Sequence, residues 1–170
     1  MGKPHYILLP VSRLFIALSL VGAFMLNLLP TGGYWGVPDW VALVLVFWNV
    51  HQPRKVGIGI AFMLGLAMDV HDAALLGEHA LAYTLLSYGA ITLHRRVLWV
   101  SVPGQMVYVL PLLMFAQFVT LAIRLFAGAA FPGPMALLQS PVATLLWPLV
   151  TVLLLAPQRR SIDRDENRPL

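Results

Sequence analysis

Cysteine is absent from the sequence, which excludes disulfides, thiolate nucleophiles and cysteine-ligated metals. Charge is also scarce: only 11% of the 170 residues are charged, against about 25% in soluble domains. Hydrophobic residues make up 59% of the chain, and its mean hydropathy is +0.81. Because long apolar runs recur throughout, the composition predicts a polytopic membrane protein. The net charge of +4 then indicates loops against an anionic lipid leaflet, and not a nucleic-acid surface.

Turn-like or charged stretches divide the chain into six apolar segments. No small-residue cleavage site follows the first, so we expect an uncleaved span and not a signal peptide. Pro111 and Pro148, inside the fifth and sixth segments, each predict a helix kink. The predicted fold class is all-α, with a six-helix transmembrane domain over residues 1–158 and a cytoplasmic charged tail over 159–170. The six predicted spans are 14–29, 38–50, 56–70, 79–93, 104–127 and 141–156.

The second segment, 38–50, is short for a membrane span. At 1.5 Å per residue it covers only about 20 Å of a hydrocarbon core about 30 Å thick. It must therefore borrow Tyr34, Trp35 and His51 at its ends, or lie where the bilayer thins. Trp48, near a predicted interface, is assigned with its neighbours to an aromatic belt.

The distribution of Lys and Arg predicts the orientation. The alternate loops 30–37, 71–78 and 128–140 contain neither residue. Because basic residues concentrate on the cytoplasmic side, both termini are predicted to be cytoplasmic. Arg124 is the single exception to this pattern. The ten basic residues on the predicted cytoplasmic side are Lys3, Arg13, Arg54, Lys55, Arg95, Arg96, Arg159, Arg160, Arg164 and Arg168.

The stretch GLAMDVHDAALLGEHAL places five polar groups within eleven positions: Asp69, His71, Asp72, Glu78 and His79. Asp69 closes the third segment, and the place of His71, Asp72 and Glu78 after it favours a solvated extracytoplasmic loop. A metal site is the alternative, because carboxylates and imidazoles are common ligands, but this spacing matches no established motif. The sequence also lacks G-x-S-x-G, H-E-x-x-H and G-x-G-D, so nothing in it supports an enzyme.

Small residues recur every four positions along the third segment. Gly57, Ala61, Gly65 and Asp69 therefore form one ridge along a helix. Such a ridge lets another helix approach closely, so we interpret it as a helix-packing or partner face. Coincidence is the alternative, since Gly and Ala are frequent in membrane helices. Interhelical hydrogen bonds are expected from Asn27, Asn49 and Gln117.

Arg124 lies near the predicted outer surface, at about the depth of Asp69. Its side chain could simply extend to the lipid headgroups. Asp69, however, ends a ridge that faces another helix, and a buried carboxylate needs a donor. We therefore predict a buried ion pair between Asp69 and Arg124, with Glu78 as the competing partner for the arginine.

Several features between positions 37 and 88 occur in a characteristic order, and a Leu146-Trp147-Pro148 step before the basic tail accompanies them. Together they resemble the rod shape-determining protein MreD family. The features are Pro38 and Trp40 at the start of the second segment, Phe47-Trp48, Pro53 with a basic residue, the glycines Gly57, Gly59 and Gly65 before Asp69, and Leu76-Gly77 before Ala80-Leu81.

The resemblance implies a non-enzymatic inner-membrane component of the bacterial cell-elongation machinery, with no catalytic residue and no cofactor. Its implied partners are the bitopic protein MreC and, directly or indirectly, MreB, RodA and the elongation transpeptidase. Together these would guide side-wall peptidoglycan synthesis and maintain rod shape. The implied fold is similar to the substrate-binding subunits of energy-coupling-factor transporters. That similarity gives the alternative function, a small-molecule-binding membrane subunit with a ligand lid in loop 71–79.

Overall fold

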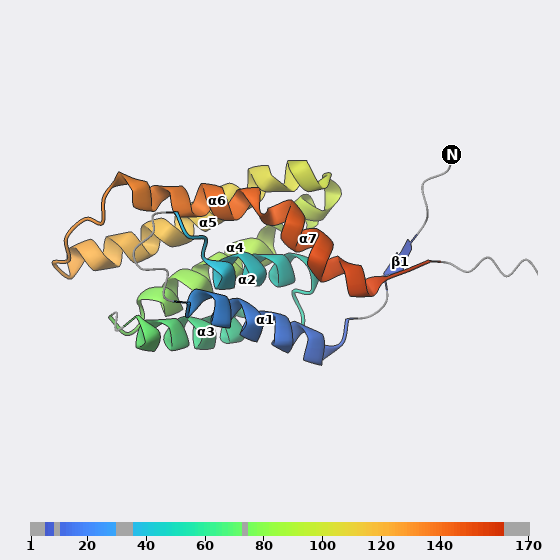
Figure 1. The fold of residues 1–170 in the computed structure, drawn as a ribbon, viewed down its shortest axis with the longest axis horizontal. Coiled ribbons are helices and arrows are strands. Elements are labelled where there is room, and N and C mark those ends of the chain that lie inside the picture. Colours follow the sequence, from blue (N-terminus) through green and yellow to red (C-terminus); the bar gives the residue numbers. More distant parts are fainter. Residues whose placement is uncertain (1–5, 9–10, 30–35, 73–74, 162–170) are drawn as a thin grey trace, which may run out of the picture.

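Helices run roughly along one long axis in the computed structural model, which describes residues 6–8, 11–29, 36–72 and 75–161 (Figure 1). Two short strands lie at one end. The elements are β1 (Tyr6–Leu8), α1 (Arg13–Asn27), α2 (Trp40–His51), α3 (Ile58–His71), α4 (Glu78–Trp99), α5 (Val102–Phe126), η1 (Pro134–Leu138), α6 (Gln139–Leu145), α7 (Trp147–Leu155), η2 (Ala156–Gln158) and β2 (Arg159–Ser161).

Each of the first five apolar segments forms one helix, so the predicted helical fold class is confirmed. The sixth segment is divided at Leu146 into α6 and α7. Pro148 lies in the first turn of α7 and has no N–H to donate to the preceding turn, which explains the interruption. Pro111 lies inside α5, which continues through it.

Among the described residues, two helical stretches are long and apolar enough to cross a membrane, Val102–Phe126 and Pro134–Gln158. The second of these runs through η1, α6, α7 and η2. The helices α1, α2 and α3 are apolar but shorter.

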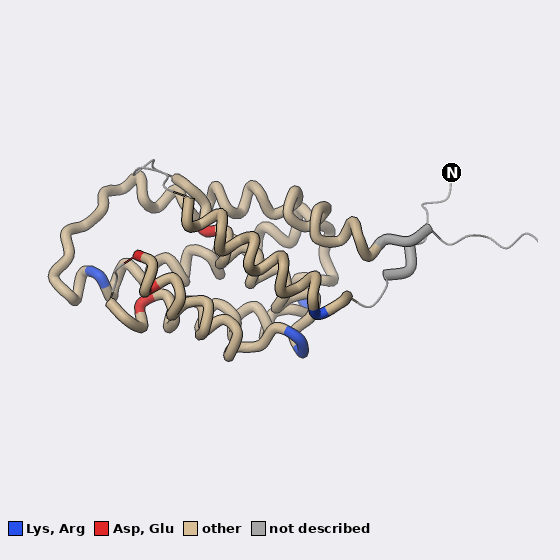
Figure 2. Tube along the Cα trace, turned by 60° about the horizontal axis from the view of Figure 1, so that its bottom comes forward, with Lys and Arg blue, Asp and Glu red and all other residues tan. Residues whose placement is uncertain are grey.

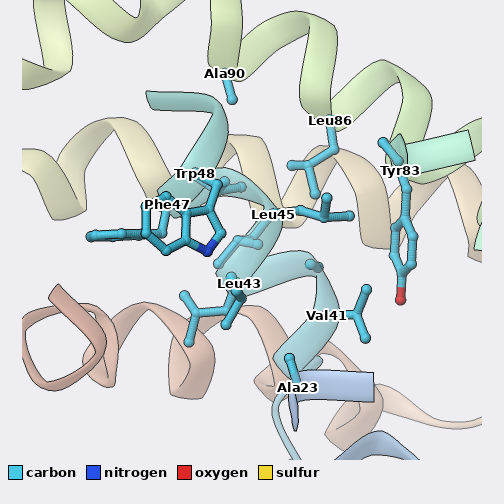
Figure 3. Close-up of a cluster of buried hydrophobic side chains, with 14 of the residues drawn as sticks. Ala23, Val41, Leu43, Leu45, Phe47, Trp48, Tyr83, Leu86 and Ala90 are labelled. Atoms are coloured by element: carbon cyan, nitrogen blue, oxygen red, sulfur yellow. The ribbon is translucent and has the colours of Figure 1, made fainter. Parts of the chain in front are cut away.

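The short helix α2 is the centre of the bundle. Every residue from Val41 to Val50 is buried, because α1, α4, α5, α6 and α7 all contact this helix. Its uniform hydrophobicity therefore reflects enclosure by protein. Of the residues expected to lengthen this short segment, His51 is the last residue of α2, and Tyr34 and Trp35 lie outside the described residues. Figure 3 shows Leu43, Leu45, Phe47 and Trp48 of α2 packed among Tyr83, Leu86 and Ala90 of α4 and Ala23 of α1.

Polar side chains join the helices inside this apolar core. Trp48 Nε1 donates to Ser19 Oγ at 2.8 Å, so the aromatic-belt assignment of this fully buried residue is wrong. Asn49 Nδ2 donates to Ser87 Oγ, also at 2.8 Å. Trp147 Nε1 donates to Gln105 Oε1 at 3.0 Å. The bond predicted for Asn49 is thus confirmed.

The two ends of the described chain meet. β1 pairs antiparallel with β2, with Ile7 opposite Arg160. Both terminal segments therefore lie at the same end of the bundle (Figure 1).

Charge is separated along the axis of the bundle. Figure 2 shows Lys and Arg gathered at the end where the terminal segments lie, with one basic position at the other end. The acidic residues, which occur directly before α2, at the end of α3 and at the start of α4, lie towards that other end.

Candidate functional site

The site begins with Asp69, in the last turn of α3. Its side chain is buried, and its carboxylate accepts backbone N–H bonds from Gly77 at 2.8 Å, His79 at 2.7 Å and Ala80 at 3.3 Å. These residues are the N-cap and first turn of α4, whose amides have no partner within their own helix. Gly77 has no side chain with which to cap them. Asp69 therefore performs the N-cap function for α4 from the neighbouring helix.

Gly65 lies one turn before Asp69 and brings α3 against α4. A Cβ at this position would lie 2.5 Å from the backbone nitrogen of Ala80 and 2.6 Å from the carbonyl carbon of His79. Real Cβ atoms essentially never approach that closely. Glycine at 65 is therefore what allows Asp69 to reach the α4 amides.

Gly77 begins α4 in a conformation that favours glycine. Its φ of 107° lies in the left-handed region, which other residues rarely adopt. The turn thus needs Gly77 for its backbone angle, while Asp69 supplies the acceptor that Gly77 lacks.

The predicted ridge is only partly a packing face. Ala61, Gly65 and Asp69 are buried. Gly57 is the N-cap of α3, and no atom lies within 4 Å of the Cβ that would be added there. The buried part of the ridge faces α4 of the same chain, so it is not available to a separate partner.

His79 adds a side-chain contact to the capping carboxylate. Its Nδ1 lies 2.9 Å from Asp69 Oδ1, so this nitrogen carries the proton and donates. Its Nε2 lies 3.7 Å from Asp72 Oδ2, towards the half-exposed end of the cluster. Asp69 thus receives four donors without any arginine.

The predicted Asp69–Arg124 pair is wrong. Arg124 Nε donates to Glu78 Oε1, the partner named as its competitor. Glu78 is the first residue of α4 and its side chain is 1% exposed, whereas Arg124 lies in the last turn of α5 and its side chain is 41% exposed. Each charge suits its helix end, because the dipole favours an acid at an N-terminus and a base at a C-terminus. The backbone amides leave Asp69 no need of a cation.

A second carboxylate, Asp39, joins three helices near the same end. Its Oδ1 caps α2 by accepting from Ala42 N at 3.0 Å, and it also accepts from Asn27 Nδ2 at 2.9 Å. Asn27 Oδ1 in turn accepts from Trp40 N at 2.9 Å. Tyr83 donates its hydroxyl to Asp39 Oδ2 at 2.7 Å. The last residue of α1 therefore helps to cap α2, and the bonding predicted for Asn27 is confirmed.

Between these groups lies a cavity of about 220 Å³. Gln117 of α5 lies on its wall and joins α5 to the last helical run: its amide donates to Ala136 O at 2.5 Å and it accepts from Ser140 Oγ at 2.5 Å. The bonding predicted for Gln117 is confirmed. Other polar groups on the wall are Asp39, Asp72, His79, Tyr83, Thr120, Arg124, Gln139 and Ser140.

The polar side chains of this site mainly form hydrogen bonds and ion pairs that join one helix to another. Within the described ranges, no group of three or more His, Asp or Glu is placed to hold a metal ion. Both carboxylate oxygens of Asp69 accept hydrogen bonds from α4. Glu78 accepts from Arg124, and His79 donates to Asp69. The hydrogen bond between Asp39 and Tyr83 was not predicted from the sequence. Only the capping role of Asp39 had a signal there, because this residue directly precedes a helix, where N-cap residues lie.

Comparison with known proteins identifies the family. A model of the rod shape-determining protein MreD family matches residues 7–156. The chain belongs to the MreD family. A rod shape-determining protein MreD from Haemophilus influenzae is 32% identical over an alignment of 146 positions, which covers 81% of this chain and 86% of that protein. No solved structure matches.

Membership supports a role in determining rod shape. The matched region contains every helix from α1 to α7. MreD is a family of shape-determining proteins and not a known enzyme family. The transporter-subunit alternative has no support from either match.

Proposed function

We propose that this chain is a non-enzymatic structural component of the cell-elongation machinery in the bacterial inner membrane. The match to MreD over residues 7–156 is the observation that carries the proposal. The contacts of the polar side chains agree with the proposal, because most of the buried polar groups form hydrogen bonds or ion pairs between helices. Asp69, Glu78 and Gln117 each fasten one helix to another.

In this role the bundle binds an MreC-like bitopic protein and helps to position side-wall peptidoglycan synthesis. MreB, RodA and the elongation transpeptidase are direct or indirect partners. A rigid bundle suits a positioning role, because a scaffold must hold its binding surfaces in fixed relative places. The interhelical bonds around α2 and at the start of α4 provide that rigidity.

Depletion in a rod-shaped cell tests the role in shape. We expect rods to become wider and then spherical, and the purified chain to retain a bitopic coiled-coil partner. Cell width measured by microscopy and affinity purification followed by mass spectrometry check the two expectations. Rods of normal width after complete depletion would overturn the proposal. Co-purification with a transmembrane coupling protein and ATPases would instead restore the transporter alternative.

The proposed orientation places both termini in the cytoplasm. The Lys and Arg gathered at one end support it, since basic residues concentrate on the cytoplasmic side of membrane proteins. A reporter that is active only in the cytoplasm should therefore work when fused after Lys55 or Leu170. It should be silent when fused after Pro132, in the loop between α5 and η1. Activity after Pro132 contradicts this orientation.

A further inference from the structure

An apolar groove opens between α1 and α3, away from the polar cluster. It has a volume of about 330 Å³. Ala17 and Leu20 of α1 line it with Ile60 and Leu64 of α3. Two cations, Arg13 and Lys55, line its end nearest the start of both helices.

The cationic end is pre-organised. Lys55 Nζ donates to the carbonyl oxygen of Val11 at 2.6 Å, which holds the ammonium beside the start of α1. An ammonium has three N–H donors, so two remain for a ligand. Arg13, the first residue of α1, is exposed and adds a guanidinium that can bind two oxygens of a phosphate.

We propose that this groove binds one anionic phospholipid, with its phosphate on Arg13 and Lys55 and an acyl chain between α1 and α3. The inference rests on the proposed membrane orientation, in which these cations face the anionic cytoplasmic leaflet. Charge complementarity selects the headgroup, since both charged residues that line the groove are basic.

The dimensions of the groove favour a lipid chain over a partner helix. The groove holds about 330 Å³ beside roughly 12 Å of α1, from residue 13 to 21. A helix is about 10 Å wide, so a helical segment of that length would occupy roughly 900 Å³. The groove therefore admits a hydrocarbon chain without moving α1 from α3.

Native mass spectrometry tests the proposal on the purified full chain in detergent. The probes are phosphatidylglycerol and phosphatidylcholine with the same acyl chains. We expect one phosphatidylglycerol to be retained per chain at a several-fold lower concentration than phosphatidylcholine. The double variant Arg13→Gln/Lys55→Gln should raise the concentration needed for half-saturation by about tenfold or more. Glutamine at 55 keeps an N–H donor near the Val11 carbonyl, on a side chain one bond shorter than that of lysine.

Two further variants separate site binding from net charge. Arg54→Gln combined with Arg95→Gln removes the same charge from residues outside the groove, and should leave retention nearly unchanged. Ala17→Phe keeps both cations but fills the groove from an exposed position, and should weaken retention several-fold.

Three outcomes would overturn the proposal. The first is equal retention of the two lipids. The second is an equal loss in the groove and control double variants, which would indicate net charge alone. In the third, Ala17→Phe leaves lipid retention unchanged but removes the bitopic partner, which would make the groove a partner site. Because lipid retention is measured without the partner or the cell, failure of the shape role leaves this result unaffected.

Discussion

Gly65→Ala should lower the stability of the bundle more than any other single-methyl addition in α3. The new Cβ would lie 2.5 Å from Ala80 N, and the obstructing atoms are backbone atoms that cannot rotate away. The two helices must separate, which also draws Asp69 away from the α4 amides. Overpacking of this kind costs about 1–3 kcal/mol and sometimes more. Thermal unfolding in detergent and the yield of folded, monodisperse protein measure the loss, and Gly65→Leu should lose more still.

Gly59→Ala provides the matched control. Gly59 lies in the same helix, it is exposed, and no atom lies within 4 Å of an added Cβ. Alanine is the better helix former by up to about 1 kcal/mol, so this variant should be as stable as the parent or slightly more so. Met63→Leu, at another exposed position of α3, should also be tolerated. Equal tolerance at positions 59 and 65 would show that the close contact with Ala80 does not hold.

The helices themselves could be predicted from the sequence because apolar runs and charged loops are local features. The bounds of α3, for example, differ from the predicted 56–70 by no more than two residues. Interhelical bonding of Asn27, Asn49 and Gln117 was also predictable, because a polar side chain inside an apolar helix must find a partner.

The spatial neighbours of the helices were not predictable in the same way. The central place of α2 depends on five other helices, and a uniformly apolar segment looks the same whether it faces lipid or protein. The partner of Asp69 was missed for a related reason. A buried carboxylate can be satisfied by a cation or by backbone amides, and sequence reasoning considered only side chains. Gly77 was the available signal in the sequence: an N-cap glycine has no side-chain acceptor, so the first amides of α4 need an acceptor from elsewhere.

Substitution of Asp69 should loosen the start of α4. Asp69→Ala leaves the amides of Gly77, His79 and Ala80 without their acceptor in a buried place, and it also frees His79 Nδ1. Loss of an N-cap costs about 0.5–2 kcal/mol, and each buried amide left unpaired costs about 1–3 kcal/mol. We therefore expect a loss of about 2 kcal/mol or more. Asp69→Asn, which keeps one acceptor oxygen, should lie between Asp69→Ala and the parent.

The amides that lose protection in Asp69→Ala distinguish this capping role from a general loss of charge. Hydrogen exchange should accelerate at the amides of residues 77–80 in Asp69→Ala, while the amides of α2 stay protected. Asp72→Ala is the matched control: this acid lies three residues away and is half-exposed, and its nearest basic atoms are histidine nitrogens at 3.7 and 3.9 Å. Asp72→Ala should change neither the stability of the bundle nor its hydrogen exchange appreciably.

The double variant Asp69→Arg/Arg124→Asp, which exchanges the two charges, should be no more stable than the less stable of its two single variants, because Arg124 pairs with Glu78. A rescue by that exchange would show instead that Asp69 and Arg124 are partners, and the capping assignment would fall.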